Sequence, residues 1–449
     1  MRLDLYDILE NTSYLKVYNK RNITINSITI DSRVPKDMFI GIKGENFDGS
    51  DFLLDVLKRG VRVCVVEKIN DKRILEKYTK QPIIVVKDTK EFLLELASYK
   101  RSLYDIPVIA ITGSAGKTTT KDFVHAVLSR SFWTLKTQDN MNNNLGVALT
   151  LLNLRKHECL VVEMGMDHYN EITPLSKACK PTISLITNIG TCHIENLGTK
   201  EDILKAKLEI LDGMEKKKLV VNNDDELLNK YALEHDFVVT YGINNESDVT
   251  CEILELNPEN SVIKCNGMII NIPKPGIHNV YNALAAITIG LMLNIRMKLI
   301  RRAIENAKVT SGRSEVIKAN GYKVISDCYN SNLEACKCAI KSLGLYNNRK
   351  IAVLGTIGEL ADYADLGHAT LGEEVYNSNI DILLTVGDHT EYINKRAIEL
   401  GLNIDNSYHF DNKLDAVNLL KKIVKKDDVI LVKASHFNNF KYIVDELIK

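Results

Sequence analysis

Residues 110–120 read Ala-Ile-Thr-Gly-Ser-Ala-Gly-Lys-Thr-Thr-Thr, and this segment constrains the chain more than any other. An apolar run at 106–111 leads into it, and a helical pattern at 121–128 follows it. A strand, a glycine loop and a helix in this order aim backbone N–H groups and a helix N-terminus at a polyphosphate. The segment therefore predicts a site for a nucleoside triphosphate.

The side chains of this loop suit phosphate chemistry. Gly113 and Gly116 permit the backbone to turn tightly around phosphate oxygens, Lys117 can reach the terminal phosphates, and the Thr118 hydroxyl can ligate Mg²⁺. The full phosphate-loop pattern has an earlier glycine where Ile111 stands, so the loop is a variant. A plain glycine turn before a helix is the alternative interpretation.

Composition narrows the classes of protein that fit. A chain of 449 residues is long enough for about three domains. Lys and Arg together number 58, as do Asp and Glu, so no bulk charge favours nucleic acid or an anionic membrane. The charged N-terminus and the lack of a long apolar run predict neither a signal peptide nor membrane insertion. The nine scattered cysteines indicate free thiols in a reducing cytoplasm, with no metal or disulfide role.

The order of the patterns predicts an α/β protein of three domains in series. Residues 1–103 alternate short apolar runs with helical stretches and predict a small α/β domain. Residues 104–310 hold the glycine loop and further β and α patterns, with an antiparallel insertion predicted at 250–272. Residues 311–449 repeat the βα alternation and predict a third, Rossmann-like sheet.

Individual elements follow from the apolar runs. The runs in the first domain predict strands at 61–66 and 83–86 and a helix at 92–99. In the central domain we expect strands at 159–163, 183–189 and 218–222, and helices at 200–211 and 279–293. In the third domain we expect strands at 323–325, 351–354, 382–386 and 429–432.

Three polar residues stand where ligands bind in open α/β sheets, at or after the carboxyl ends of predicted strands. Glu163 ends a hydrophobic strand and could hold Mg²⁺, although a solvated strand-end glutamate is the plainer interpretation. His193 follows another strand, and a single histidine is more often structural. Lys205 and Lys207 lie on the next helix, where lysines are usually solvated.

Clusters of amides mark three further segments. Residues 140–146 read Asn-Met-Asn-Asn-Asn-Leu-Gly before a helix, which suits helix capping and the positioning of a phosphate or substrate. Residues 276–282 and 326–332 carry amides and a carboxylate that suit base and ribose recognition. Each of them alone could be ordinary turn chemistry.

Taken in order, these segments resemble the Mur ligase superfamily, ATP-dependent amide-forming enzymes of cell-wall precursor synthesis. The resemblance runs from Asp31 to the C-terminus. Glu163 falls on the magnesium-binding glutamate of the superfamily, His193 on its metal-binding histidine, and Lys207 on the lysine that it carbamylates to make a metal ligand. The phosphate loop of the superfamily falls on Gly113, Ser114, Ala115, Gly116, Lys117, Thr118 and Thr119.

Within the superfamily, the sequence is most similar to the branch that joins D-alanyl-D-alanine to a UDP-N-acetylmuramoyl-tripeptide. The resemblance implies that the first domain binds the uridine nucleotide and that the third receives the amine and closes over ATP. It also implies a monomer, with these substrates as its small-molecule partners. The implied substrate-binding residues are Ser32, Arg33, Lys43, Asp48, Gly49, Asn142, Asn143, Tyr329, Asn330 and Asn332.

The resemblance also implies a mechanism in which a substrate carboxylate attacks the γ-phosphate of ATP and an amine then displaces phosphate from the acyl phosphate. Thr118 and Glu163 would hold one Mg²⁺ ion, and His193 and carbamylated Lys207 a second. Lys117 would neutralise the phosphates. By resemblance, Asn279, Arg313 and Asp327 are assigned to adenine, phosphate and ribose contacts.

The sequence departs from the branch pattern mainly in the third domain. Leu333 replaces a proline, Thr356 an aspartate and Ala361 a glycine, while His436 replaces an arginine and Lys441 stands near the place of an acid. Two alternatives therefore stay open: a divergent ligase with another amine acceptor, and a non-catalytic ATP-binding regulator. A GTPase or motor ATPase fits least, because no motif for recognising guanine is evident.

Overall fold

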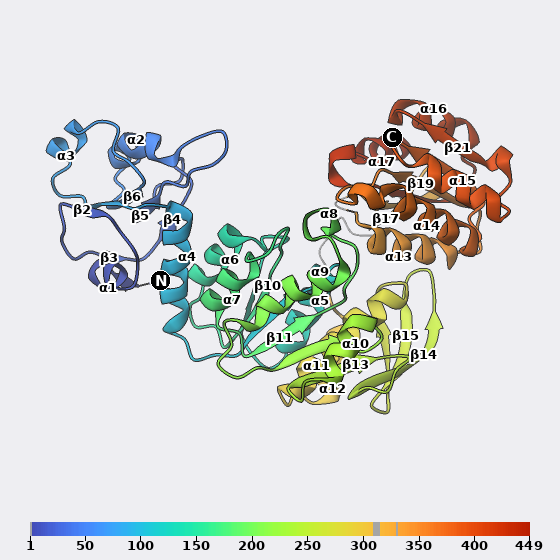
Figure 1. The fold of residues 1–449 in the computed structure, drawn as a ribbon, viewed down its shortest axis with the longest axis horizontal. Helices are drawn as coiled ribbons and strands as arrows, with labels where there is room; N and C mark the ends of the chain where they lie inside the picture. The colour runs from blue at the N-terminus through green and yellow to red at the C-terminus, as the bar shows by residue number, and fades with distance from the viewer. Residues whose placement is uncertain (1, 309–314, 329–330) are drawn as a thin grey trace.

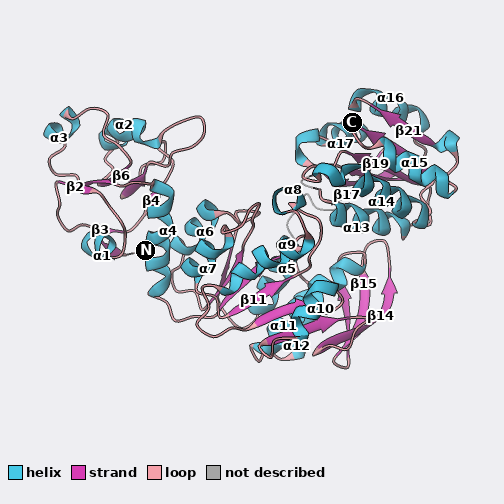
Figure 2. Cartoon of the chain, in the orientation of Figure 1, coloured by secondary structure: helices cyan, strands magenta, loops and turns pink. Residues whose placement is uncertain are grey.

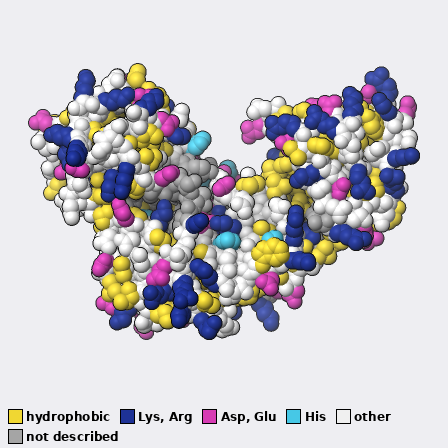
Figure 3. Space-filling model, turned by 180° about the vertical axis from the view of Figure 1, so that it is seen from behind, with side chains coloured by type: hydrophobic (Ala, Val, Ile, Leu, Met, Phe, Trp, Pro, Cys, Tyr) yellow, Lys and Arg dark blue, Asp and Glu magenta, His cyan; other side chains and the backbone are white. Residues whose placement is uncertain are grey.

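The computed structural model describes residues 2–308, 315–328 and 331–449. Figure 1 shows three lobes, with the N-terminal and C-terminal lobes at either end of a central lobe. In the space-filling view of Figure 3 the surface is hollowed between the two outer lobes, and basic and acidic side chains are interspersed over it. Among the described helices, none has the length and apolar character needed to cross a membrane.

The N-terminal lobe contains a five-stranded sheet in the order β2-β7-β6-β5-β4, and a short antiparallel pair, β1 and β3. Its strands are β1 (Leu3–Asp4), β2 (Lys16–Tyr18), β3 (Thr24–Ile25), β4 (Ile28–Thr29), β5 (Met38–Ile40), β6 (Val63–Val66) and β7 (Ile83–Val85). Its helices are α1 (Leu5–Glu10), η1 (Gly49–Phe52), α2 (Leu53–Lys58), α3 (Arg73–Lys77) and α4 (Thr89–Ser102). Helix α4 packs against α6 and α7 of the central lobe, so the two lobes share apolar contacts.

The central lobe is built on nine strands in the order β16-β15-β14-β13-β12-β11-β8-β10-β9. The strands are β8 (Val108–Thr112), β9 (Thr134–Lys136), β10 (Cys159–Glu163), β11 (Ile183–Ile186), β12 (Leu219–Asn222), β13 (Val238–Gly242), β14 (Val249–Leu256), β15 (Ser261–Cys265) and β16 (Met268–Ile272). The helices are α5 (Lys117–Leu128), α6 (Asn144–Leu152), α7 (Ile172–Cys179), α8 (Ile194–Leu197), α9 (Lys200–Leu208), η2 (Glu209–Leu211), α10 (Glu226–Leu233), α11 (Ile277–Met292) and α12 (Met297–Glu305).

The parallel strands β8, β10, β11 and β12 of the central sheet are buried on both faces, and Figure 2 shows helices on either side of them. Successive residues of a strand point to opposite faces. Val108 and Ala110 accordingly join the core under α6 and α7, whereas Ile109 and Ile111 join the core under α5 and α11. This double burial explains why the strands read as continuous apolar runs.

The C-terminal lobe is a six-stranded sheet in the order β17-β18-β22-β19-β20-β21. The strands are β17 (Glu315–Ala319), β18 (Tyr322–Asp327), β19 (Lys350–Gly355), β20 (Ile382–Val386), β21 (Ser407–Phe410) and β22 (Val429–Lys433). The helices are α13 (Leu333–Gly344), η3 (Ala361–Tyr363), α14 (Ala364–Asn377), α15 (Glu391–Leu400), η4 (Ile404–Asn406), α16 (Lys413–Ile423), η5 (His436–Asn438) and α17 (Lys441–Ile448).

The three-part α/β architecture expected from the sequence is confirmed, and the predicted strands at 159–163 and 382–386 match β10 and β20 end to end. The segment predicted as an antiparallel insertion, 250–272, forms β14 to β16. It continues the central sheet, because β14 pairs in parallel with β13 before the chain turns back. The domain boundaries at residues 103 and 310 stay predictions.

Candidate active site

The glycine loop lies at the carboxyl end of β8, between β10 and β11. Gly113 and Gly116 have φ angles of +148° and +81°, a region that residues with a side chain rarely adopt. A Cβ atom on Gly116 would also come within 2.6 Å of Asn282 Oδ1. Lys117 Nζ donates to the carbonyl of Gly113 at 2.7 Å, so the ammonium lies against the loop that begins α5.

Residues Thr187 and Asn188, which follow the neighbouring strand β11, form hydrogen bonds with the glycine loop. The backbone N–H of Ala115 donates to Asn188 Oδ1 at 2.9 Å, and Thr187 Oγ1 donates to the carbonyl of Ala115 at 2.6 Å. These bonds fix the shape of the loop. A binding loop that is already formed loses less conformational entropy when its ligand arrives.

Glu163 is buried at the end of β10, with 1% of its surface exposed, so the alternative of a solvated strand end does not hold. Its Oε1 accepts from Thr118 Oγ1 at 3.2 Å and from Asn142 Nδ2 at 2.9 Å. Its Oε2 lies 3.3 Å from Nζ of Lys121, which is fully buried. The structure thus brings together two residues that the sequence analysis selected for Mg²⁺, Thr118 and Glu163.

Lys121→Met is expected to lower the free energy of unfolding by about 3 kcal/mol, because breaking a buried ion pair leaves the remaining charge without compensation. Urea unfolding of the central lobe measures this. The matched control is Arg301→Met in α12, which removes an exposed pair with Glu305 and is expected to change stability by less than about 0.5 kcal/mol. If both variants lost the same free energy of unfolding, the Lys121–Glu163 pair would contribute no more to stability than a surface pair.

Lys207 on α9 is 1% exposed, whereas Lys205 on the same helix is exposed. Burial, and secondarily the positive charge of Lys117, lower the pKa of Lys207 to about 7. No ion pair of Lys207 is found in the part of the chain that the structure describes. Lys205 is therefore a solvated lysine on the helix surface, as the plainer interpretation expected, whereas Lys207 is not.

His193 lies where a loop enters α8, with a φ of +64°. Its Nδ1 is 2.7 Å from Glu359 Oε2 and 3.2 Å from Asp167 Oδ1. Burial alone would lower the pKa of His193, but the Cys192 thiol and the Glu359 carboxylate raise it to about 9. An imidazole must be neutral to bind a metal, so metal binding here would release a proton.

Three contacts bring the C-terminal lobe over the glycine loop. Asn332 Nδ2 donates to the carbonyl of Ser114 at 2.9 Å. Glu334 Oε1 accepts from the backbone N–H of Thr191 at 2.6 Å. The third contact is the Glu359–His193 pair already described. Groups from two lobes therefore meet at one end of the central sheet.

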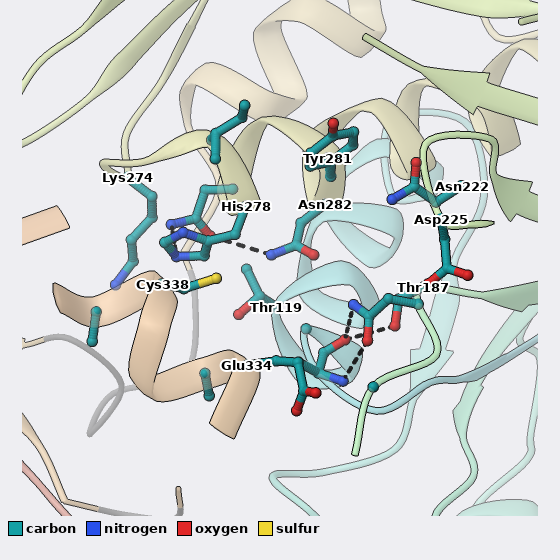
Figure 4. Close-up of a pocket in the computed structure, with 18 of the residues that line it drawn as sticks. Thr119, Thr187, Asn222, Asp225, Lys274, His278, Tyr281, Asn282, Glu334 and Cys338 are labelled. Carbon is teal, nitrogen blue, oxygen red and sulfur yellow. Dashed lines mark hydrogen bonds between the residues drawn. The ribbon is translucent and has the colours of Figure 1, made fainter. Parts of the chain in front are cut away.

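Two adjoining cavities open beside the loop and share Ala115, Gly116 and Ala335. The first, of about 360 Å³, contains Asn279 and Asp327 in its lining, and Figure 4 shows Tyr281, Asn282 and Thr187 around it. The second, of about 590 Å³, is the larger of the two. Its lining includes Ser114, Lys117, Thr118, Asn142, Asn143, Glu163, His193 and Asn332.

Polar contacts fix the side chains of the first cavity. Asn279 Nδ2 donates to the carbonyl of Pro275 at 2.7 Å, and the buried Lys433 pairs with Asp327 at 2.7 Å. Burial lowers the pKa of His278 to about 4, so this imidazole is neutral at pH 7. A lining that is partly apolar and includes a neutral imidazole suits a nucleobase.

The two cavities do not account for all of the predicted site residues. Arg313, Tyr329 and Asn330 fall outside the described residues. The five predicted substrate residues of the N-terminal lobe, Ser32, Arg33, Lys43, Asp48 and Gly49, line neither cavity.

Local contacts in the N-terminal lobe account for three of these five. Arg33 pairs with Asp31 at 2.9 Å, and Asp48 accepts from the N–H of Ser50 at 2.8 Å, which caps η1. Gly49 packs against the backbone of Gly41 so closely that a Cβ atom would clash. From the same lobe, Lys90 lines the second cavity.

Sequence reasoning did not select Lys121, Asp167, Glu334, Glu359 or Lys433 as site residues. Lys121 could have been found, since it follows Lys117 by four residues and so shares its helix face. Asp167, Glu334 and Glu359 reach the site only through tertiary contacts, which local spacing does not report.

Comparison with known proteins adds to this geometry. Three family models match: "Mur ligase family, catalytic domain" at residues 21–101, "Mur ligase middle domain" at 111–290, and "Mur ligase, glutamate ligase domain" at 312–436. The UDP-N-acetylmuramoyl-tripeptide–D-alanyl-D-alanine ligase of Bacillus subtilis (strain 168) is 34% identical over 436 residues, which cover 95% of this chain and 93% of that protein. The chain belongs to the Mur ligase family.

Other ligases and solved structures are similar to this chain over most of its length. The ligase of the same name from Escherichia coli (strain K12) is 30% identical and is covered over 92% of each chain. A crystal structure of MurF from Acinetobacter baumannii superposes with a TM-score of 0.89 at 30% identity, covering 100% of this chain and 99% of that one. A MurF ligase from Thermotoga maritima, solved in complex with ADP, shares the fold with a TM-score of 0.81 at 24% identity. This member of the Mur ligase family is therefore an ATP-dependent ligase of the same three-part build.

Proposed function

We propose that this chain joins D-alanyl-D-alanine to a UDP-N-acetylmuramoyl-tripeptide, at the expense of ATP, in the synthesis of peptidoglycan precursors. One observation carries the proposal: two cavities meet over the glycine loop, and Thr118 of that loop hydrogen-bonds to the buried Glu163. The relatives that match at least 92% of this chain have this activity in their names. The first cavity receives the adenosine moiety, and the second receives the phosphates and the carboxylate of the tripeptide.

The physical problem of the reaction is repulsion, because a carboxylate must approach a polyphosphate. In the first step, a carboxylate oxygen bonds to the γ-phosphorus and the bond to the bridging oxygen breaks, which releases ADP. In the second step, the amine nitrogen bonds to the acyl carbon, inorganic phosphate leaves with that oxygen, and the nitrogen loses a proton. Both steps need groups that stabilise negative charge while excluding water.

The chain supplies such groups on the described elements. Lys117, at the start of α5, neutralises charge on the terminal phosphates. Thr118 and Glu163 present oxygen atoms in a buried cluster, a donor set that fits Mg²⁺. Mg²⁺ bound there would screen the phosphates and stabilise charge during phosphoryl transfer. Asn332 of the third lobe holds that lobe on the loop and helps to exclude water.

Lys207 fits the proposed carbamylation. Its amine nitrogen would bond to the carbon of CO₂ and lose a proton, which turns a buried cation into a carboxylate that can bind Mg²⁺ together with His193. Only the neutral amine reacts, and a pKa of about 7 leaves a large neutral fraction at physiological pH. An ordinary lysine, with a pKa near 10.4, would leave very little.

Activity is expected to fall as the pH decreases below about 7, because Lys207 then becomes protonated and cannot hold the carbamate. Phosphate release in buffers from pH 6 to 8.5, with and without added bicarbonate, measures this. Bicarbonate is expected to restore part of the rate at the acidic end. A rate that is indifferent to bicarbonate at every pH would contradict the assignment.

The remaining assignments extend this proposal. Asn279 and Asp327 contact adenine and ribose, Asn142 and Asn143 position the substrate, and the N-terminal lobe binds the uridine nucleotide. The proposed setting is the cytoplasm, with the chain acting as a monomer. All nine cysteines are free in the structure, which accords with a reducing compartment.

Incubation with ATP, the UDP-muramoyl-tripeptide and D-alanyl-D-alanine, followed by mass spectrometry, tests the function. The expected product has the mass of the two substrates joined with loss of water. A parallel panel of other dipeptides and amino acids tests the divergent-acceptor alternative, which the changed residues Thr356 and His436 of the third lobe favour. Nucleotide binding without turnover of any substrate would instead support the non-catalytic regulator.

A further inference from the structure

A second cluster of ligand atoms shares His193 with the proposed magnesium site and includes a cysteine. The Sγ atom of Cys192, a ring nitrogen of His193 and a carboxylate oxygen of Glu359 all lie within 4.8 Å of one another. His193 Nδ1 is buried and makes no aligned hydrogen bond, although it faces Glu359 Oε2 at 2.7 Å. Asp167 Oδ1, 3.2 Å from the same nitrogen, is a fourth candidate donor.

The spacing and chemistry of these atoms fit a particular class of metal. Zn²⁺ binds sulfur at about 2.3 Å and nitrogen or oxygen at about 2.0–2.2 Å, so the donors around a tetrahedral ion lie roughly 3–4 Å apart. Mg²⁺ prefers oxygen ligands throughout and makes no use of a thiolate. For a site with mixed sulfur, nitrogen and oxygen donors, affinity for Zn²⁺ exceeds that for harder cations.

We propose that Cys192, His193 and Glu359 form a binding site for a thiophilic divalent cation of the Zn²⁺ class, with Asp167 as an additional oxygen donor. The site is reachable, because Cys192, His193, Glu359 and Asp167 all line the second cavity. Cys192 and His193 belong to the central lobe and Glu359 to the C-terminal lobe. The bound ion therefore ties the two lobes together.

This site has a consequence that rests on the proposed function. His193 cannot serve the magnesium site while it is bound to Zn²⁺, and the tie to Glu359 opposes the lobe movement that substrate entry and product release require. Zn²⁺ is therefore an inhibitor of the ligase at concentrations far below those of Mg²⁺. Cys192 is the residue that confers this sensitivity.

Direct binding of Co²⁺ and Zn²⁺ to the full-length protein tests the site without any activity measurement. Co²⁺ bound to a thiolate gives an intense charge-transfer absorption, so the wild type is expected to show this band with one equivalent of Co²⁺. Zn²⁺ is expected to displace it. Cys192→Ala is expected to lose the band and to bind Zn²⁺ at least about tenfold more weakly, since one strong ligand is gone.

Two further variants make the result specific. Cys328→Ala removes a cysteine whose Sγ contacts the carbonyl of Val432 in the third lobe, and is expected to bind Co²⁺ like the wild type. Glu359→Gln is expected to keep the thiolate band but weaken Zn²⁺ binding, because the amide is a poorer ligand. Circular dichroism shows whether each variant is folded. A wild type without the thiolate band, or Cys192→Ala binding Zn²⁺ as tightly as the wild type, would overturn the proposal.

Inhibition separates this inference from the proposed function. With Mg²⁺ and ATP in excess, Zn²⁺ is expected to inhibit the wild type at a concentration at least about tenfold lower than it inhibits Cys192→Ala, each measured against its own zinc-free rate. Equal inhibition of both would contradict the consequence for catalysis. If no ligation is detected at all, the proposed function fails, while the Co²⁺ spectrum still decides whether the metal site exists.

Discussion

Lys117→Ala is expected to lower the ATP-dependent release of phosphate by about 10³-fold, the effect typical of losing a cation that stabilises charge during phosphoryl transfer. The ammonium of Lys117 lies against the carbonyl of Gly113, in the loop that faces the second cavity. Without it, the approach of a carboxylate to the γ-phosphate meets uncompensated repulsion. The loss is expected in kcat more than in the KM for ATP, because the backbone of the loop still holds the nucleotide.

Two controls accompany this variant. Lys156→Ala removes an exposed lysine of the same lobe and is expected to leave the rate unchanged. Lys117→Arg keeps the charge with a different shape, so it is expected to recover only a small part of the rate. A Lys117→Ala protein that turns over at near-normal speed would remove Lys117 from the mechanism.

Lys207→Ala is expected to lower the rate by at least about 10²-fold, because the proposed second Mg²⁺ would lose one of its ligands. The variant is not expected to unfold more readily, since an uncompensated buried ammonium is itself unfavourable. A small carboxylic acid such as acetate or propionate, which can occupy the space left by the side chain, is expected to restore part of the activity. Steady-state rates and melting temperatures measured on the same preparations test both statements.

Lys205→Ala is the matched control, because Lys205 lies two residues away on the same helix with its side chain in solvent. It is expected to keep the wild-type rate and to show no response to carboxylic acids. Full activity of Lys207→Ala, or equal rescue of both variants, would show that Lys207 carries no metal ligand. Loss of activity with a lowered melting temperature and no rescue would point to a structural role.

Much of the fold could be predicted because the central strands of a parallel sheet are continuous apolar runs in the sequence. Strand β10 is buried on both faces and therefore reads as four apolar residues before Glu163, which marks its end in the sequence. The N-terminal lobe was harder to predict. Its strands β1, β3 and β4 are only two residues long and form through pairing with distant partners, so no local periodicity marks them.

Some residues of the candidate site could also be predicted from the sequence, and others could not. The glycine loop and Glu163 could be selected because the ends of adjacent parallel strands meet at one sheet edge. The burial that lowers the pKa of Lys207 depends on how α9 packs, and the contact of Glu359 with His193 depends on how two lobes meet. Neither property is encoded in the spacing of nearby residues. The family resemblance supplied the proposed role of Lys207, and only the structure supplied the contact between Glu359 and His193.

Transfer of an oxygen isotope shows whether the second cavity brings a substrate carboxylate to the γ-phosphate of ATP. The tripeptide substrate is prepared with ¹⁸O in its reacting carboxylate and converted in the presence of ATP and D-alanyl-D-alanine. With both carboxylate oxygens labelled, each inorganic phosphate released is expected to carry one ¹⁸O atom, because the acyl phosphate breaks at its carbon–oxygen bond. Phosphate that contains no ¹⁸O, released while the peptide product accumulates, would contradict this expectation.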